Sequence, residues 1–233
     1  MHDHVLITGA SRGLGCALAR AFHAAGARVS AVARSEPELR ALADELGHER
    51  LATARLDLAD RATLRPALAA LEARFGPVDA LINNAGTGSY KPFLESSPEE
   101  LALQVEVNLL GLVLLTREVV PAMVARGRGH LVHIASDLAR KPLANMAVYA
   151  ATKHAVAGFS QSLARELRTA GVKSTVVNPG IVNTHFGGRA PSANTQPWEL
   201  DPGHLAGVIV DLVRQPPGVN VDELSVHALG QDF

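Results

Sequence analysis

The chain has 233 residues, of which 47% are apolar and 19% are charged, a composition typical of a packed globular protein and not of a disordered one. Its 22 Lys and Arg residues nearly balance its 23 Asp and Glu residues, and the net charge of −1 argues against nucleic acid or an anionic membrane as a partner. One cysteine excludes an internal disulfide, and no Cys/His spacing suggests a metal site, so we expect no metal. The polar start lacks the features of a signal peptide and no apolar stretch reaches about 18 residues, so we expect a cytoplasmic protein.

Short apolar runs alternate with longer Ala- and Leu-rich stretches of helical period, the pattern of parallel strands joined by helices. The predicted strands cover residues 4–9, 28–33, 52–58, 80–86, 129–136, 173–180 and 223–229. The predicted helices cover residues 13–25, 37–46, 60–75, 98–126, 148–170 and 202–214. Six crossovers predict an α/β protein with a doubly wound sheet, in one domain over residues 1–233.

The first predicted strand ends in the glycine-rich run Thr8-Gly9-Ala10-Ser11-Arg12-Gly13-Leu14-Gly15 and leads into a helix. Backbone N–H groups at such a helix start can face a phosphate without intervening side chains, which suggests a dinucleotide site. The spacing is G-x-x-x-G-x-G and not the commoner G-x-G-x-x-G, and glycines also gather at ordinary tight turns. This run alone therefore leaves the question open.

Further polar residues follow the fourth and fifth predicted strands. The fourth ends in Asn83-Asn84-Ala85-Gly86, which also fits a plain turn, and the fifth ends in Ser136. Tyr149 and Lys153 stand at i and i+4 and share one helix face, which places an ammonium beside a phenol. A nearby cation favours phenolate, the tuning that a general acid/base needs. Taken singly, each residue also reads as an ordinary surface pair or a turn cap.

Together these residues resemble the short-chain dehydrogenase/reductase family over most of the chain, with Asn108 and Asn178-Pro179-Gly180 also in place. The resemblance implies a Rossmann-like fold with a seven-stranded parallel sheet in the order 3-2-1-4-5-6-7. It implies a catalytic tetrad of Asn108, Ser136, Tyr149 and Lys153. Tyr149 would transfer the proton while Ser136 hydrogen-bonds the reacting oxygen. Lys153 would lower the pKa of Tyr149 and bind ribose, and Asn108 would hold a water or simply bond to nearby backbone.

The same resemblance implies a set of cofactor contacts. These are Gly9, Ser11, Arg12, Gly13, Leu14, Gly15, Arg34, Asp57, Leu58, Asn84, Ala85, Gly86, Tyr149, Lys153, Pro179, Gly180, Ile181 and Thr184. Asp57 and Leu58 would meet the adenine, although Asp57 alternatively caps the following helix. Ile181 and Thr184 would reach the nicotinamide carboxamide.

The cofactor type depends on the end of the second strand. Ala33 stands where an Asp would bind the ribose 2′-hydroxyl of NAD, and Arg34 follows it. With Arg12, two guanidinium groups suit a 2′-phosphate, so NADP(H) is predicted over NAD. Glu36 argues the other way, but it precedes Pro37, where a carboxylate in the first turn of a helix is its expected role.

The segment 181–200 has no periodicity and is interpreted as a flap on the substrate side or as an ordinary surface loop. Phe186 and Trp198 within it would either close over an apolar substrate or anchor the loop.

The predicted activity is NADP-linked interconversion of a carbonyl and a secondary alcohol on a small molecule. Oxoacyl thioesters, 3-hydroxy acids and generic carbonyls all remain candidate substrates. The alternatives are a non-catalytic NADP-binding regulatory protein, whose expected mark is a broken tetrad, and a sugar epimerase or dehydratase, which usually has a longer chain. The helices near 98–126 and 148–170 pack between subunits in this family, which implies a homodimer or homotetramer, unless their apolar faces only cover their own sheet.

Overall fold

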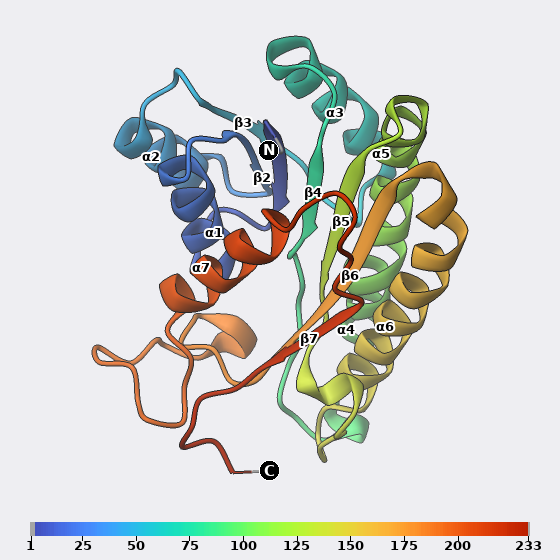
Figure 1. The fold of residues 1–233 in the computed structure, drawn as a ribbon. Coiled ribbons are helices and arrows are strands. Elements are labelled where there is room, and N and C mark those ends of the chain that lie inside the picture. Colours follow the sequence, from blue (N-terminus) through green and yellow to red (C-terminus); the bar gives the residue numbers. More distant parts are fainter. Residues whose placement is uncertain (1–2, 233) are drawn as a thin grey trace.

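The structure is a computed structural model that describes residues 3–232, so residues 1, 2 and 233 lie outside it. Its strands are β1 (His4–Thr8), β2 (Arg28–Ala33), β3 (Leu51–Arg55), β4 (Ala80–Asn83), β5 (Gly129–Ile134), β6 (Val172–Pro179) and β7 (Glu223–Val226). They form one parallel sheet in the order β3-β2-β1-β4-β5-β6-β7, which confirms the predicted order (Figure 1).

Helices cover both faces of this sheet, as Figure 1 shows. They are α1 (Gly13–Ala24), α2 (Glu36–Leu46), α3 (Arg61–Phe75), α4 (Pro98–Val105), α5 (Leu112–Arg126), α6 (Ala147–Leu167) and α7 (Pro202–Val213). Helices α1, α2 and α7 share one apolar cluster with the sheet, and α3 and α5 share another on the opposite face. Every residue of β1, β4, β5 and β6 is buried, as expected for parallel strands covered on both sides.

Several strands are shorter than predicted at their carboxyl ends. The predicted strand 4–9 ends at Thr8, because Gly9 adopts a φ of +68° and turns the chain toward α1. The predicted strand 80–86 ends at Asn83, because the next residues bond sideways to the end of β1. These residues therefore form loops at one edge of the sheet, where open α/β sheets bind ligands.

The predicted helix 98–126 is continuous but not uniform, because a π-helix (Glu106–Gly111) joins α4 to α5. By length and hydropathy alone, the continuous helix Pro98–Arg126 is long and apolar enough to cross a membrane. The prediction that no apolar stretch reaches that length is therefore wrong. In this helix, the side chains Leu112, Leu115, Val119 and Met123 are buried in the cores beneath it. The helix Pro98–Arg126 is thus a core helix of the α/β fold.

Candidate active site

The glycine-rich loop between β1 and α1 forms an open cradle. Gly13 has a φ of +56°, and a Cβ at Gly15 would lie 2.2 Å from the Gly9 carbonyl oxygen, so side chains are excluded from the bend. The first turn of α1 contains no acidic residue, and the Arg12 side chain does not cap it. The backbone N–H groups of this first turn are therefore available to an anion, and this set of donors fits the diphosphate of a dinucleotide.

The end of β4 is bound tightly to the end of β1. The Thr8 hydroxyl accepts hydrogen bonds from the backbone N–H groups of Asn84 and Ala85, both at 3.0 Å. The Asn84 side chain donates to the Thr8 carbonyl at 2.9 Å. Thr8 opens the glycine motif but is absent from the predicted contacts. Thr8 therefore holds the glycine-rich loop and the loop after β4 together.

Tyr149 and Lys153 lie on the buried face of α6. The Lys153 Nζ donates to the Ile134 carbonyl at 2.7 Å and lies 5.5 Å from the centre of the Tyr149 ring. Burial lowers the pKa of Lys153 to about 8. Burial also raises the pKa of Tyr149, a hydrogen bond with Ser136 opposes that rise, and the charge of Asp137 adds to it. The predicted lowering of the Tyr149 pKa is therefore not found, because desolvation dominates.

Asn108 lies in the π-helix and is buried beside the end of β4. Its Oδ1 accepts from the Thr87 N–H at 2.7 Å, and its Nδ2 donates to the Thr87 carbonyl at 2.8 Å and to the Thr152 hydroxyl at 3.1 Å. A Cβ at Gly86 would lie 3.4 Å from Asn108 Oδ1 and 3.7 Å from Lys153 Nζ. Asn108 thus clamps the loop after β4 against the tetrad, and the water it is predicted to hold stays a prediction.

Ser136 follows β5 and caps a short 3₁₀ turn (Asp137–Ala139). Its hydroxyl accepts from the Leu138 N–H at 3.2 Å, so the predicted turn-capping role is real. Ser136 also acts to lower the pKa of Tyr149, so the two groups expected at the reacting oxygen lie close together. Structural and chemical roles coexist at this residue.

The segment 181–200 lies over both halves of the site. A Cβ at Gly13 would be 3.2 Å from the Thr184 side chain, so the segment begins above the glycine loop. The Phe186 ring packs on the Tyr149 ring with their centres 5.1 Å apart. A Cβ at Gly88 would lie 2.9 Å from both rings. Gly88 was not predicted, although its place two residues beyond Gly86 is a signal for close packing.

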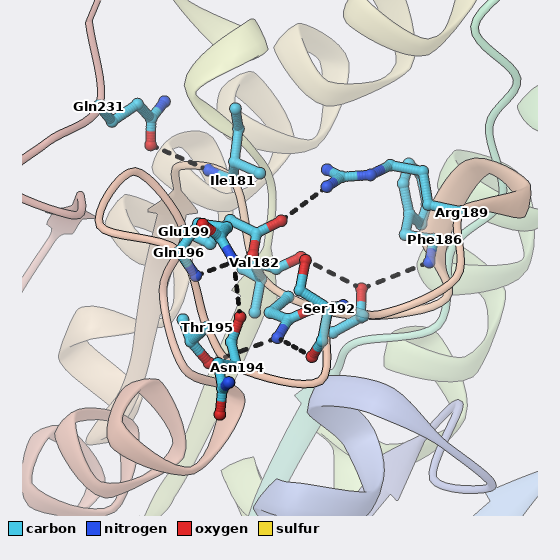
Figure 2. A network of polar contacts seen from close by, with 12 residues as sticks. Ile181, Val182, Phe186, Arg189, Ser192, Asn194, Thr195, Gln196, Glu199 and Gln231 are labelled. Atoms are coloured by element: carbon cyan, nitrogen blue, oxygen red, sulfur yellow. Dashed lines mark hydrogen bonds and ion pairs between the residues drawn. The ribbon is translucent and has the colours of Figure 1, made fainter.

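The same segment is cross-linked internally (Figure 2). The Asn183 side chain both donates to the Ser192 carbonyl at 3.0 Å and accepts from the Ser192 N–H at 2.8 Å. Arg189 pairs at 2.6 Å with Glu199, whose side chain is fully buried. These contacts make 181–200 a self-supporting loop, with Phe186 directed to Tyr149 while Trp198 stacks on Arg189.

The remaining predicted cofactor residues lie along the same edge of the sheet. Ala33 is buried at the end of β2, while Arg34 and Arg12 are exposed. Asp57 accepts from the Ala59 N–H at 3.0 Å, and Asp60 is the residue that caps α3, so the helix-capping alternative for Asp57 is wrong. The others in this part of the edge are Ser11, which is half-buried, and Leu14 and Leu58, which are buried.

Two further observations bear on predicted ligands. Glu36 begins α2, as expected for a carboxylate in the first turn of a helix. Within residues 3–232, no group of three or more His, Cys, Asp or Glu side chains is placed to hold a metal ion.

Fold, glycine cradle and tetrad define a class of protein, and comparison with known proteins agrees. The sequence profile of the short chain dehydrogenase family matches residues 3–194. The chain belongs to the short-chain dehydrogenase/reductase family, a family of oxidoreductases.

Individual relatives are similar over nearly the whole chain. The NADP-dependent 3-hydroxy acid dehydrogenase YdfG of Salmonella typhi is 34% identical over 98% of this chain and 96% of its own. An alcohol dehydrogenase of Thermococcus sibiricus, solved with 5-hydroxy-NADP, superposes with a TM-score of 0.93 at 30% identity, over 99% of this chain and 98% of that one. A closed form of serine dehydrogenase with NADP⁺ superposes with a TM-score of 0.92 at 34% identity, over 99% and 96%.

Proposed function

We propose that this chain is an NADP(H)-dependent oxidoreductase that interconverts a 3-hydroxy acid and its carbonyl form, with Tyr149 as the proton donor and acceptor. The observation that carries the proposal is the burial of Ser136, Tyr149 and Lys153 together beside an open glycine cradle. The substrate class is supported by relatives called 3-hydroxy acid dehydrogenase and serine dehydrogenase, since serine is itself a 3-hydroxy acid.

The proposed chemical role of each residue follows from the environment of its side chain. When bound, NADP(H) supplies or accepts the hydride. Because burial raises the pKa of Tyr149, its phenol holds a proton at neutral pH and is set to donate it to a carbonyl oxygen. The Ser136 hydroxyl hydrogen-bonds that oxygen. Lys153, with a pKa of about 8, is still cationic at neutral pH and stabilises the phenolate that Tyr149 becomes.

Replacement of Tyr149 tests the chemistry. Tyr149→Phe removes only the hydroxyl, and general acid/base catalysis contributes about 10²–10⁴ in rate, so kcat for 3-hydroxybutyrate, 3-hydroxypropionate or serine with NADP⁺ should fall by that factor. NADPH binding, followed by fluorescence, should survive. The matched control is Tyr90→Phe, which changes the only other tyrosine, one that is 66% exposed. Near-parental kcat in Tyr149→Phe would show that the proton comes from elsewhere.

The cofactor preference is proposed from the end of β2. Ala33 presents no carboxylate to repel a 2′-phosphate, and the exposed guanidinium groups of Arg34 and Arg12 are free to turn toward one. A hydrogen bond to a charged group contributes about 1.5–3 kcal/mol, so tenfold or greater preference for NADPH over NADH is expected. Ala33→Asp should reverse the preference without changing kcat. Equal binding of NADH and NADPH by the parent would remove the NADP assignment.

Self-association is proposed from the outer faces of the long helices. Leu103 and Val105 on α4 are 39% and 42% exposed, and the small residues Ala151 and Gly158 line the outer surface of α6. Such a face suits close packing against a second copy, as a homodimer or homotetramer. Light scattering at micromolar concentration should return a multiple of 24.5 kDa, and a value of 24.5 kDa itself would refute association.

A further inference from the structure

In the segment after β7, the side chain of Gln231 hydrogen-bonds two loops of the candidate site. Gln231 Oε1 accepts from the Ile181 N–H at 3.0 Å, and Gln231 Nε2 donates to Asp137 Oδ2 at 2.9 Å. Figure 2 shows Gln231 directed to the backbone of Ile181. Both ends of the amide are used, so its orientation is determined by its partners.

Two glycines make room for this contact. A Cβ at Gly180 would lie 2.1 Å from Gln231 Oε1, and one at Gly230 would lie 2.8 Å from the Pro197 carbonyl oxygen. Gly230 also donates its N–H to that oxygen at 3.2 Å. Neither glycine has a positive φ, so it is the missing side chain that matters here and not backbone freedom. The segment therefore touches the loop 181–200 near both of its ends.

The two partners of Gln231 belong to different halves of the site. Asp137 follows Ser136, the residue expected at the reacting oxygen, while Ile181 begins the loop that carries Thr184 and Phe186. We propose that Gln231 is a positioning residue that holds the Ser136 loop and the start of the 181–200 loop at a constant separation. This role rests on the proposed function, because hydride transfer requires the oxygen site and the nicotinamide site to stay aligned within a fraction of an ångström.

Asp137 explains why a glutamine suits this position. Its side chain is buried, and among residues 3–232 its Oδ1 has no hydrogen-bond partner. The amide of Gln231 is the neutral donor that stabilises the Asp137 charge, through Oδ2. The charged or titratable groups facing it are His227, with Nε2 3.6 Å from Oδ2, Lys141 and Tyr149. Burial raises the pKa of Asp137, whereas the hydrogen bond from Gln231, His227 and Lys141 lower it. A carboxylate in place of Gln231 would meet Asp137 with like charge.

An exchange of donor and acceptor tests the contact. Gln231→Glu places two carboxylates together, so kcat at pH 8 should fall tenfold or more and recover partly at pH 6, where the pair shares a proton. In the double variant with Gln231→Glu and Asp137→Asn, the new amide at position 137 donates to the new carboxylate at position 231. That carboxylate can still accept from the Ile181 N–H, so kcat of the double variant should return to within about threefold of the parent value. A double variant no better than Gln231→Glu would overturn the proposal.

A second measurement needs neither cofactor nor turnover. In Gln231→Leu, hydrogen exchange at the Ile181 amide should rise at least tenfold because the Gln231 acceptor is lost, and exchange should also rise at the neighbouring Gly230 amide, which donates to the Pro197 carbonyl. The matched control is Asp232→Ala, which alters the next, exposed residue and should change neither exchange nor kcat. Unchanged exchange at Ile181 overturns the contact while leaving the proposed function intact. If Gln231→Leu raises the exchange at Ile181 but Tyr149→Phe keeps full activity, the contact is confirmed and the proposed function is refuted.

The kinetic signature separates positioning from general weakening. If Gln231 aligns the reacting groups, Gln231→Glu should lower kcat more than it raises KM, and the isotope effect with NADPD should increase because hydride transfer becomes rate-limiting. A change confined to KM, or a lower Tm with an unchanged isotope effect, would show that Gln231 has only a structural role.

Discussion

Lys153 should be a residue whose removal abolishes activity and stabilises the fold. Its side chain is 4% exposed, it donates to one backbone carbonyl, and within residues 3–232 no carboxylate pairs with it. Burial lowers its pKa from 10.5 to about 8, which corresponds to about 3 kcal/mol of unfavourable free energy for holding the charge in the folded state. Lys153→Met keeps the length of the side chain and removes that charge. Since it also removes a hydrogen bond from a charged group, which contributes about 1.5–3 kcal/mol, the net gain should be about 0–1.5 kcal/mol.

Thermal unfolding of the cofactor-free protein at pH 7 measures this gain, which for a chain of this size is a rise in Tm of up to about 6 °C. The pH dependence gives a second check. Between pH 8 and 10.5 the unfolded state keeps a proton that folded Lys153 has released, so the parent gains stability with rising pH. Lys153→Met should lack that gain. The control is Lys91→Met, which breaks a surface ion pair with Glu100 that is worth about 0–1 kcal/mol. A Lys153→Met variant that melts below the parent at pH 7 would refute the reasoning.

Three further changes have outcomes that the structure determines. Gly15→Ala forces a methyl group against the Gly9 carbonyl and should lower the free energy of unfolding by about 1–3 kcal/mol, as measured by urea unfolding. The matched control is Gly207→Ala, in open space on α7, which should raise the free energy of unfolding by about 0.5–1 kcal/mol. Lys173→Met should destabilise by about 2–3 kcal/mol in the same assay, the opposite sign to the other buried lysine, because Lys173 donates to three backbone carbonyls that would lose their partner. Phe186→Ala should leave NADPH affinity unchanged while admitting bulkier hydroxy acids, seen as a higher kcat/KM for long relative to short substrates, since its ring packs on that of Tyr149, the proposed proton donor.

Much of the fold follows from local patterns. Buried parallel strands read as short apolar runs, and the crossover helices have a clear period, so strand order was predictable once the family resemblance was recognised. The ends of the strands were less predictable, because the sequence at Asn84 and Ala85 looks like a continued strand whereas both residues hydrogen-bond to Thr8. A lateral hydrogen bond between two strand ends leaves no periodic signal.

The site was predictable where it rests on motifs and not where it rests on distant contacts. Tyr149 and Lys153 share a helix face by spacing alone, yet the pKa of Tyr149 depends on how deeply α6 packs, which spacing does not reveal. Gln231 meets Asp137 across 94 residues of sequence, and it lies in a short irregular segment without a motif. Gly88 is identified only by the two rings that enclose it.

The π-helix before α5 constrains how relatives of this chain can vary in length. A π-turn completes the same rotation as an α-turn with one residue more. Deleting one residue from 106–111 would therefore close this stretch as an ordinary α-turn with the faces of α4 and α5 unchanged, and would remove the bulge that holds Asn108 against Thr87. Sequence alignments of functional relatives should therefore place their gaps outside this stretch, and a one-residue gap inside it would mark a protein that has lost the clamp on the loop after β4.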